Sequence, residues 1–317
     1  MASASNPVTS VVNPFNQKET LLYYVTSKRQ LALERWPLDP AAASNRRLHN
    51  DNGTIGGRFA TPGVLATVVR QGVITVYGFL PVDSSDHVDI SGSDEPANAR
   101  TDLNYVAQLS PIVNPVKAGE DMQTSLFGLA AADDGDTTTW IYYTKLPAPG
   151  EDPIIYESTI NVDSAVANPL NKDLQPLVNS KLAVIKYPDS DDRVLFYQDN
   201  DNDNKIYAYF PSRDEDSSKT LNRSAAFPGT PIAATISGSG DNLVTYVYFV
   251  DPSKDLVCSI KRGGIDGKWE APILVPRSKK VNANSQLTVT TDSRHNHIFY
   301  IETGGRSYTE LVHPLVK

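Results

Sequence analysis

The chain has 317 residues, of which 40% are hydrophobic and 21% charged, so it can bury a sizeable core. Its formal net charge is −8 and its pI is about 5.2, which argues against nucleic acid as a partner. No apolar run approaches the roughly 20 residues that cross a bilayer, so we expect no membrane partner either.

The first ten residues, MASASNPVTS, lack the basic and apolar regions of a signal peptide. The single cysteine, Cys258, excludes an internal disulfide and suits a cytoplasmic protein. We therefore expect a cytoplasmic chain as written, and a secreted one if a signal was trimmed. Two glycosylation sequons, at Asn52 and Asn222, matter only in the secreted case.

A repeated phrase of strands runs through the chain, and each copy contains one strand rich in aromatic residues. The aromatic anchors of the six copies are Tyr23, Tyr77, Tyr142, Phe196, Tyr248 and Phe299. Successive anchors are 54, 65, 54, 52 and 51 residues apart. A regular period near 50 residues, with three or four strands per unit, predicts a β-propeller. A β-sandwich with long loops is the alternative, but it has no reason to keep a regular period.

Each anchor strand lies between two others. The strands before the anchors are TSVVNPF, VLATVV, FGLAAA, KLAVIK, PIAATIS and QLTVTT, and their small residues suit the crowded axis of a propeller. The strands after the anchors are QLALERW, HVDIS, PIIYESTI, KIYAYF, DLVCSIKR and SYTELVH. A fourth strand is clearest in APILVP, and residues 164–178 are expected to form a loop. We predict one all-β domain over residues 1–317, a six-bladed β-propeller.

The last repeat ends just after its third strand. We therefore expect the segment before Thr20 to supply the missing fourth strand and to close the ring by removing two free edges.

The fourth and fifth copies resemble blades of the fungal fucose-specific lectin family. The phrases that carry the resemblance are LAVIKYPDSDDRVLFYQDNDNDNKIYAYF and TYVYFVDPSKDLVCSIKRGGIDGKWEAP. The resemblance implies a six-bladed propeller that binds fucose between blades. It also implies an arginine two residues before each anchor, a glutamate on the third strand and nearby aromatic walls.

The two columns do not keep this pattern: only Glu157 fits, and its own blade has Trp140 at the arginine position. The arginine column reads Leu21, Thr75, Trp140, Val194, Tyr246 and His297. The glutamate column reads Leu33, Ile90, Glu157, Ala208, Cys258 and Thr309. Arg193 lies one position early, and a one-residue shift turns a side chain to the opposite face of its strand. The sequence thus predicts that no blade carries the arginine–glutamate pair.

A related interpretation follows from these replacements. Some fungal biosynthetic enzymes with a lectin-like fold are hetero-Diels–Alderases that join a quinone methide to a terpene alkene. Such a pericyclase would use apolar small-molecule substrates, no cofactor and no metal. Its catalytic donors would be Tyr246, His297 and Arg193, and its substrate-binding residues Trp36, Trp140, Glu157 and Trp269. For each tryptophan, packing between blades is the favoured interpretation. The alternative is a carbohydrate-binding lectin with altered specificity, and a scaffold without a small ligand is a third.

Two clusters could bind metal, although neither is complete in sequence. Residues 199–204, DNDNDN, alternate oxygen ligands but lack the glycine and distal glutamate of a calcium loop. His295 and His297 share one face of a strand, but no third zinc ligand is indicated. Cys258 is expected to be a buried core residue. The sequence leaves the oligomeric state open, with a dimer as one option.

Overall fold

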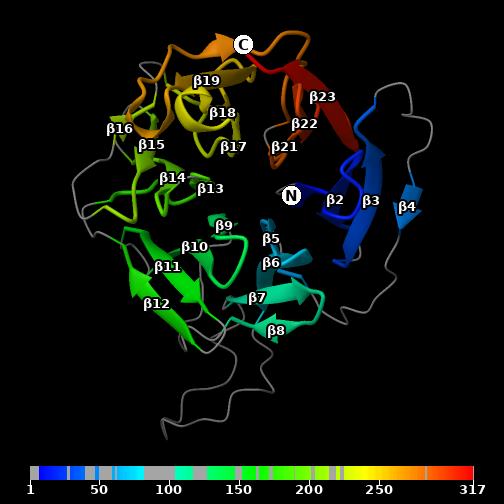
Figure 1. Cartoon of the computed structure of the whole chain (residues 1–317), viewed down its shortest axis with the longest axis vertical. Helices are drawn as coiled ribbons and strands as arrows, with labels where there is room; N and C mark the ends of the chain where they lie inside the picture. The colour runs from blue at the N-terminus through cyan, green and yellow to red at the C-terminus, as the bar shows by residue number, and fades with distance from the viewer. Residues whose placement is uncertain are drawn as a thin grey trace, which may run out of the picture.

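Six separate antiparallel sheets surround a common centre, and we number them as blades 1 to 6 in chain order (Figure 1). In the computed structural model the described residues are 7–26, 29–39, 47–49, 59–60, 63–81, 104–116, 127–146, 152–161, 164–170, 174–188, 190–200, 204–213, 219–221, 225–282 and 284–316. The predicted six-bladed propeller is confirmed, and the sandwich is excluded because no two sheets merge into larger layers.

Each blade begins at the centre and steps outward strand by strand (Figure 1). Blade 1 is β1 (Val8–Val12), β2 (Glu19–Val25), β3 (Leu31–Pro37) and β4 (Arg47–His49). Blade 2 is β5 (Ala66–Arg70), β6 (Val73–Pro81), β7 (Asn104–Ser110) and β8 (Asn114–Pro115). Blade 3 is β9 (Leu129–Asp133), β10 (Thr139–Lys145), β11 (Ile154–Ile160) and β12 (Ala165–Pro169).

The remaining blades follow the same plan. Blade 4 is β13 (Ala183–Lys186), β14 (Arg193–Gln198), β15 (Ile206–Tyr209) and β16 (Lys219–Thr220). Blade 5 is β17 (Ala233–Ser237), β18 (Val244–Val250), β19 (Leu256–Arg262) and β20 (Ile273–Leu274). Blade 6 is β21 (Thr288–Thr291), β22 (His295–Ile301) and β23 (Tyr308–Pro314). Two short 3-10 helices, η3 (Gly240–Asn242) and η4 (Gly264–Asp266), lie in blade 5.

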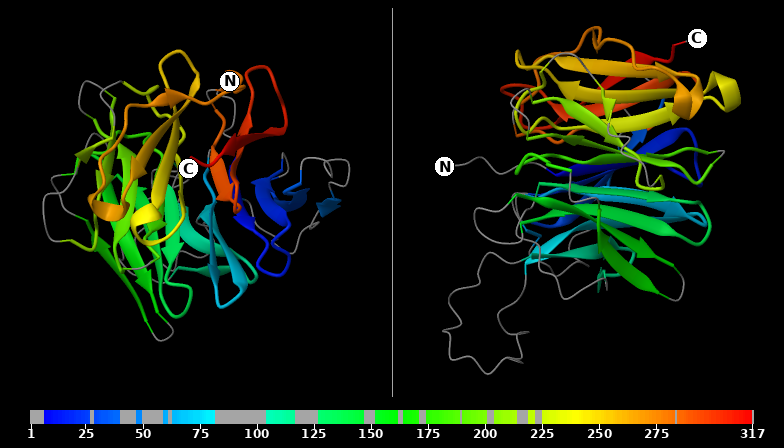
Figure 2. Two further views of the ribbon diagram at one scale, coloured as in Figure 1. Left: turned by 45° about the horizontal axis from the view of Figure 1, so that its top comes forward. Right: turned by 90° about the vertical axis from the view of Figure 1, so that its left-hand side faces the viewer.

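The inner strands form a complete ring of contacts. β1 touches β5, and contacts continue through β9, β13, β17 and β21 back to β1. Figure 2 shows the same blades from two further directions. A separate hydrophobic cluster fills each junction between neighbouring blades, and the aromatic anchors belong to these clusters. The core is therefore distributed around the ring, one portion per junction.

The way in which the N-terminal segment closes the ring differs from the expectation. Val8–Val12 pairs with β2 as the inner strand of blade 1, and blade 6 has three strands within the described residues. The segment reaches blade 6 through side chains instead: the Val8 amide donates to Gln286 Oε1 at 3.0 Å, and Ser10 bonds Thr288 at 2.8 Å. Because Val8–Val12 is already the inner strand of blade 1, it is not the outer strand of blade 6, and residues 1–6 lie outside the described residues.

Two smaller expectations are corrected by strand pairing. The third strand of blade 2 is β7, because Asn104–Ser110 pairs with β6, whereas HVDIS lies outside the described residues. Part of the expected loop at residues 164–178 is the outer strand β12, which pairs with β11. In the described part of the chain, no helix has the length and apolar character needed to cross a bilayer.

Candidate functional site

The second strand of each blade alternates its side chains between two neighbouring blades. In β14, Val194 and Phe196 join the cluster shared with blade 5, while Leu195 and Tyr197 join the cluster shared with blade 3. Because the side-chain period of a strand is two residues, Arg193 points the same way as Leu195, toward blade 3.

Arg193 meets three side chains of blade 3 at this junction. Its Nε donates to Tyr142 Oη at 2.8 Å, and its Nη2 lies 3.4 Å from Glu157 Oε2. The guanidinium carbon lies 4.1 Å from the centre of the Trp140 ring, within cation–π range. Tyr142 in turn donates to Glu157 Oε2 at 2.6 Å. We call Trp140, Tyr142, Glu157 and Arg193 the blade 3–4 site.

Tyr142 holds the cation and the acid together. Burial, followed by the charge of Glu157, raises the pKa of the Tyr142 hydroxyl well above its ordinary value. The phenol therefore keeps its proton, accepts a hydrogen bond from Arg193 and donates one to Glu157. Tyr142 was expected only to be an aromatic anchor, although its position two residues after Trp140 on the same face of the strand was a usable signal.

The blade 3–4 site retains unused polar capacity. Arg193 has five N–H donors, and the described residues occupy only those on Nε and Nη2. The other carboxylate oxygen of Glu157 accepts a 3.3 Å hydrogen bond from Thr159 and has lone pairs to spare. The side chains of Glu157 and Arg193 are 17% and 9% exposed. The site thus combines a cationic donor, an acidic acceptor and an aromatic face.

The expectation that the arginine–glutamate pair is absent was wrong at this junction. The one-residue offset of Arg193 does turn it to the opposite face of its strand, as predicted. That face, however, is directed toward blade 3, where Trp140 and Glu157 contact Arg193. The pair therefore forms between two blades, and an alignment of positions within single blades cannot reveal it.

Strand register also changes the glutamate column. The glutamate-column position on the third strand is the one that pairs with the anchor: Glu157 pairs with Tyr142, and Cys258 pairs with Tyr248. In blade 6, however, Phe299 pairs with Glu310, so that Glu310 replaces Thr309 as the column member. In blade 2, Tyr77 pairs with Gln108, which replaces Ile90. The column thus contains two glutamates.

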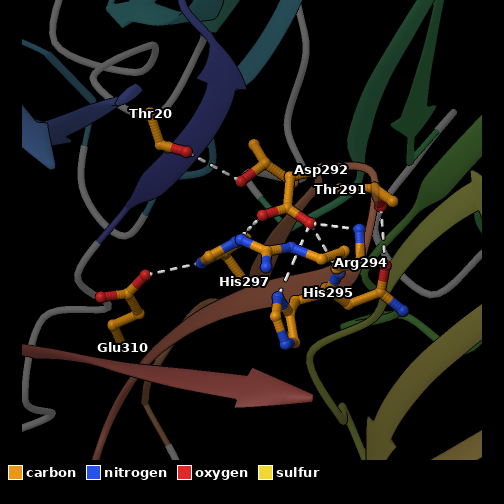
Figure 3. Close-up of polar contacts among 9 residues, drawn as sticks. Thr20, Thr291, Asp292, Arg294, His295, His297 and Glu310 are labelled. Carbon is orange, nitrogen blue, oxygen red and sulfur yellow. Dashed lines mark hydrogen bonds and ion pairs between the residues drawn. The ribbon is translucent and has the colours of Figure 1, made fainter. Parts of the chain in front are cut away.

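The second glutamate, Glu310, binds the histidine of the arginine column. His297 Nδ1 lies 2.8 Å from Glu310 Oε1, and His297 Nε2 lies 3.2 Å from Asp292 Oδ2 (Figure 3). Burial disfavours the charged imidazole, but the bonds from Glu310 and Asp292 outweigh it and raise the pKa of His297. Blade 6 therefore has a histidine–glutamate pair at the two column positions.

Two other predicted residues lie in packed surroundings. Tyr246 is fully buried, and its hydroxyl accepts a 3.0 Å hydrogen bond from the Val316 amide. Trp36 is 2% exposed, donates to Glu34 Oε2 at 2.8 Å and meets Phe299 edge-on at 5.1 Å. Trp36 thereby joins blade 1 to blade 6, and the packing interpretation describes it better than that of a substrate wall.

The third tryptophan, Trp269, lies at the blade 4–5 junction. It meets Phe196 edge-on at 5.9 Å, and the Lys261 ammonium lies 5.6 Å from its ring. The rings of Tyr187 and Phe210 are also within 5.7 Å of the same ammonium. Of the predicted residues, the structure thus brings together Trp140, Glu157 and Arg193, whereas Tyr246, His297, Trp36 and Trp269 lie at other junctions.

The remaining sequence candidates are resolved in part. Cys258 is buried, as expected, and burial raises the pKa of its thiol above the ordinary range. Of the DNDNDN stretch, residues 201–203 lie outside the described residues, as do Asn52 and Asn222. The sequence indicated no third metal ligand beside His295 and His297, but the structure places the carboxylate of Asp292 within 4.8 Å of both ligand nitrogens.

Comparison with known proteins identifies relatives and similar structures, but no protein-family model matches the chain. The chain is 26% identical over 312 residues to a wall-associated proteinase of Coccidioides posadasii and 25% identical to one of Coccidioides immitis. Each alignment covers 96% of this chain and 94% of the relative.

Solved structures of lectins share the fold at low identity. The Aleuria aurantia lectin superposes with a TM-score of 0.63 at 14% identity, covering 99% of this chain and 96% of that one. The SapL1 lectin in complex with alpha methyl fucoside gives 0.64 at 11%, covering 99% and 97%. A triple arginine-to-alanine mutant of AofleA from Arthrobotrys oligospora gives 0.66 at 14%, covering 98% and 87%. The chain therefore has the six-bladed β-propeller fold of the fungal fucose-specific lectins.

Proposed function

We propose that this protein binds carbohydrate and that a monosaccharide unit is held at the blade 3–4 site. The observation that carries the proposal is the Arg193 guanidinium lying beside Glu157 and over Trp140. A guanidinium donates paired hydrogen bonds to hydroxyl oxygens, a carboxylate accepts from hydroxyl hydrogens, and an aromatic ring covers the apolar side of a sugar.

The class of sugar is suggested by the similar structures. SapL1 and the Aleuria aurantia lectin are described with fucosides, and we propose a fucose-type residue for this chain. The number of strong sites would nevertheless be small, because the proposal depends on an arginine that lies both beside a glutamate and over a tryptophan ring, as Arg193 does at the blade 3–4 site. We therefore expect one strong site per chain. The two relatives are named for association with the wall, and fungal walls are rich in polysaccharide, which is a fitting setting for a glycan-binding protein.

Peptide hydrolysis, which the relatives' names suggest, has less support. A serine or cysteine proteinase needs a nucleophile near a histidine base. His297 binds two carboxylates and His313 binds Tyr248, while His295 lies near Asp292. None of these three described histidines is hydrogen-bonded to a serine or cysteine side chain. The described histidine contacts therefore give no support to a serine or cysteine proteinase, whereas the contacts of Arg193 support carbohydrate binding.

The cycloaddition hypothesis stays a prediction, and its main argument has weakened. It rested on the loss of every cation–acid pair from the sugar columns, whereas Arg193 lies beside Glu157 and His297 beside Glu310. Its proposed donor Tyr246 is fully buried against the C-terminal backbone. No described contact favours an apolar diene over a sugar.

Glycan-array binding followed by calorimetric titration with alpha methyl fucoside tests the proposal. We expect the wild type to bind fucosylated glycans, and Arg193→Lys and Glu157→Gln to weaken binding at least about tenfold, which is 1.4 kcal/mol. Arg262→Lys is the matched control, because Arg262 also pairs with a glutamate, Glu270, but on blade 5. The proposal fails if no glycan binds, or if both site variants bind as well as the control.

A further inference from the structure

At the blade 6–1 junction, Asp292 in the turn between β21 and β22 lies close to His295 and His297 at the start of β22. The ligand atoms of Asp292, His295 and His297 lie within 4.8 Å of one another (Figure 3). Two histidines with one carboxylate form a ligand set suited to zinc and related ions. This cluster is separate from the blade 3–4 site and does not depend on the proposed sugar function.

Both ring nitrogens of His297 lie next to carboxylate oxygens. Its Nδ1 must carry a proton, because its partner at 2.8 Å is the carboxylate of Glu310, which only accepts when ionised. Its Nε2 then faces a second acceptor, Asp292 Oδ2, at 3.2 Å. Two lone pairs at that distance repel, so that a proton or a metal cation must lie between them.

The spacing fits a metal. Zinc binds histidine nitrogen and carboxylate oxygen at about 2.0–2.1 Å, and two such ligands at a tetrahedral angle lie about 3.3 Å apart. The observed separation between Nε2 and Oδ2 is 3.2 Å. The third ligand, His295, has its Nδ1 3.8 Å from Asp292 Oδ1, and its side chain is 31% exposed. Its ligand atom lies within 4.8 Å of those of Asp292 and His297, close enough for one ion to join all three.

The surroundings hold the ligands in place. Asp292 Oδ1 accepts 2.6 Å hydrogen bonds from the backbone amides of Arg294 and His295, which leaves Oδ2 directed at His297. His297 is fully buried, and its bond to Glu310 fixes the ring orientation. A carboxylate behind a ligating histidine is the usual support of a metal site. The charges also balance, since a divalent cation would neutralise Asp292 and Glu310.

We propose that Asp292, His295 and His297 bind a divalent transition-metal ion of the zinc class, with Glu310 orienting His297. The fourth position, next to the partly exposed His295, would be completed by water or a ligand oxygen. A three-residue set with an open position is typical of zinc sites that also bind an exogenous group.

Calorimetric titration of the chelator-treated full chain with Zn²⁺ tests this assignment. We expect one Zn²⁺ per chain for the wild type, a loss of at least tenfold in affinity for Asp292→Asn and for His295→Ala, and a loss of about 10–100-fold for Glu310→Gln. Asp134→Asn is the matched control, because Asp134 forms the corresponding turn in blade 3 with backbone bonds of 2.9 Å and no histidine.

Thermal melting with and without Zn²⁺ provides a second measurement. Zn²⁺ should raise the Tm of the wild type and of Asp134→Asn, but not that of Asp292→Asn, because only a bound ion stabilises the folded state. The assignment is overturned if the wild type binds no Zn²⁺. It is overturned equally if Asp292→Asn and His295→Ala, shown to be folded by circular dichroism, bind Zn²⁺ as tightly as the control.

Discussion

Arg193 of blade 4 lies beside Glu157 of blade 3, and the hydroxyl of Tyr142 bridges them. The three groups form one connected polar network, and Tyr142 also belongs to the hydrophobic cluster of this junction. Removing one member takes a hydrogen bond from each of its partners in a partly buried position, which costs more than the loss of a typical exposed hydrogen bond. The network is therefore expected to influence both stability and ligand binding.

The Tyr142→Phe variant tests the bridge. It removes an acceptor from Arg193 and a donor from Glu157, and we expect the free energy of unfolding to fall by about 1–3 kcal/mol. Tyr246→Phe is the matched control, because that hydroxyl accepts only a neutral backbone hydrogen bond, and its loss should cost about 0.5–1.5 kcal/mol. Urea denaturation of both variants measures the difference, and equal costs would contradict a special role for the bridge.

Phe299 tests the closure of the ring. It is fully buried against Trp36 at the junction between the last blade and the first. Phe299→Ala should lower the free energy of unfolding by about 3–5 kcal/mol, because it removes a large side chain and leaves a cavity. Phe15→Ala is the control, since Phe15 is 84% exposed and should change stability by less than about 0.5 kcal/mol. A small effect of Phe299→Ala in denaturant titration would show that this junction does not hold the ring together.

Burial of Lys181 is expected to make the stability of the fold depend on pH between neutral and alkaline values. Its ammonium lies 4.4 Å from the centre of the Phe127 ring, and burial lowers its pKa from 10.5 to about 7. Between these values the unfolded chain holds a proton that the folded chain lacks, so stability should rise as the pH rises through this window. Because the side chain keeps some exposure, the slope should be shallow. Lys181→Met should remove this rise in thermal melts taken from neutral to alkaline pH, and an unchanged slope would contradict the assignment.

Asp134 gives an acid pH dependence of the opposite sign. Burial alone would raise the pKa of its carboxyl, but bonds from the backbone amides of Thr138 and Asp136 outweigh it and lower the pKa from 3.8 to about 2. The stabilisation is therefore present above the unfolded value and lost as the pH falls toward 2. Asp134→Asn keeps an acceptor but cannot ionise. Its melting temperature should lie below that of the wild type at neutral pH, and this difference should shrink as the pH falls toward 2. A constant difference in melting temperature would contradict the prediction.

Much of the fold could be predicted from local sequence. The inner strands at KLAVIK and PIAATIS and the anchors Phe196 and Tyr248 all lie where the period places them, because alternation and turn chemistry act over a few residues. The period also indicates the number of blades. The prediction of the third strand of blade 2 was wrong because of the long insertion in the second copy. HVDIS has a strand-like composition, but the third strand, β7, lies further along the chain.

The candidate sites were less predictable, because each one is built from residues on different strands. Assigning Thr309 instead of Glu310 to the glutamate column is an error of one position, which only the pairing of β22 with β23 corrects. Likewise, Asp292 is the proposed third metal ligand because the turn between β21 and β22 brings its Oδ2 within 3.2 Å of His297 Nε2.

The sequence by itself determined that this chain folds as a ring of six sheets, because each repeat carries its own strand periodicity and turns. The tertiary structure alone decided which side chains meet. Arg193 contacts Glu157 because neighbouring blades turn opposite faces toward each other, and that relation depends on how sheets pack around the axis, which no spacing within one blade encodes.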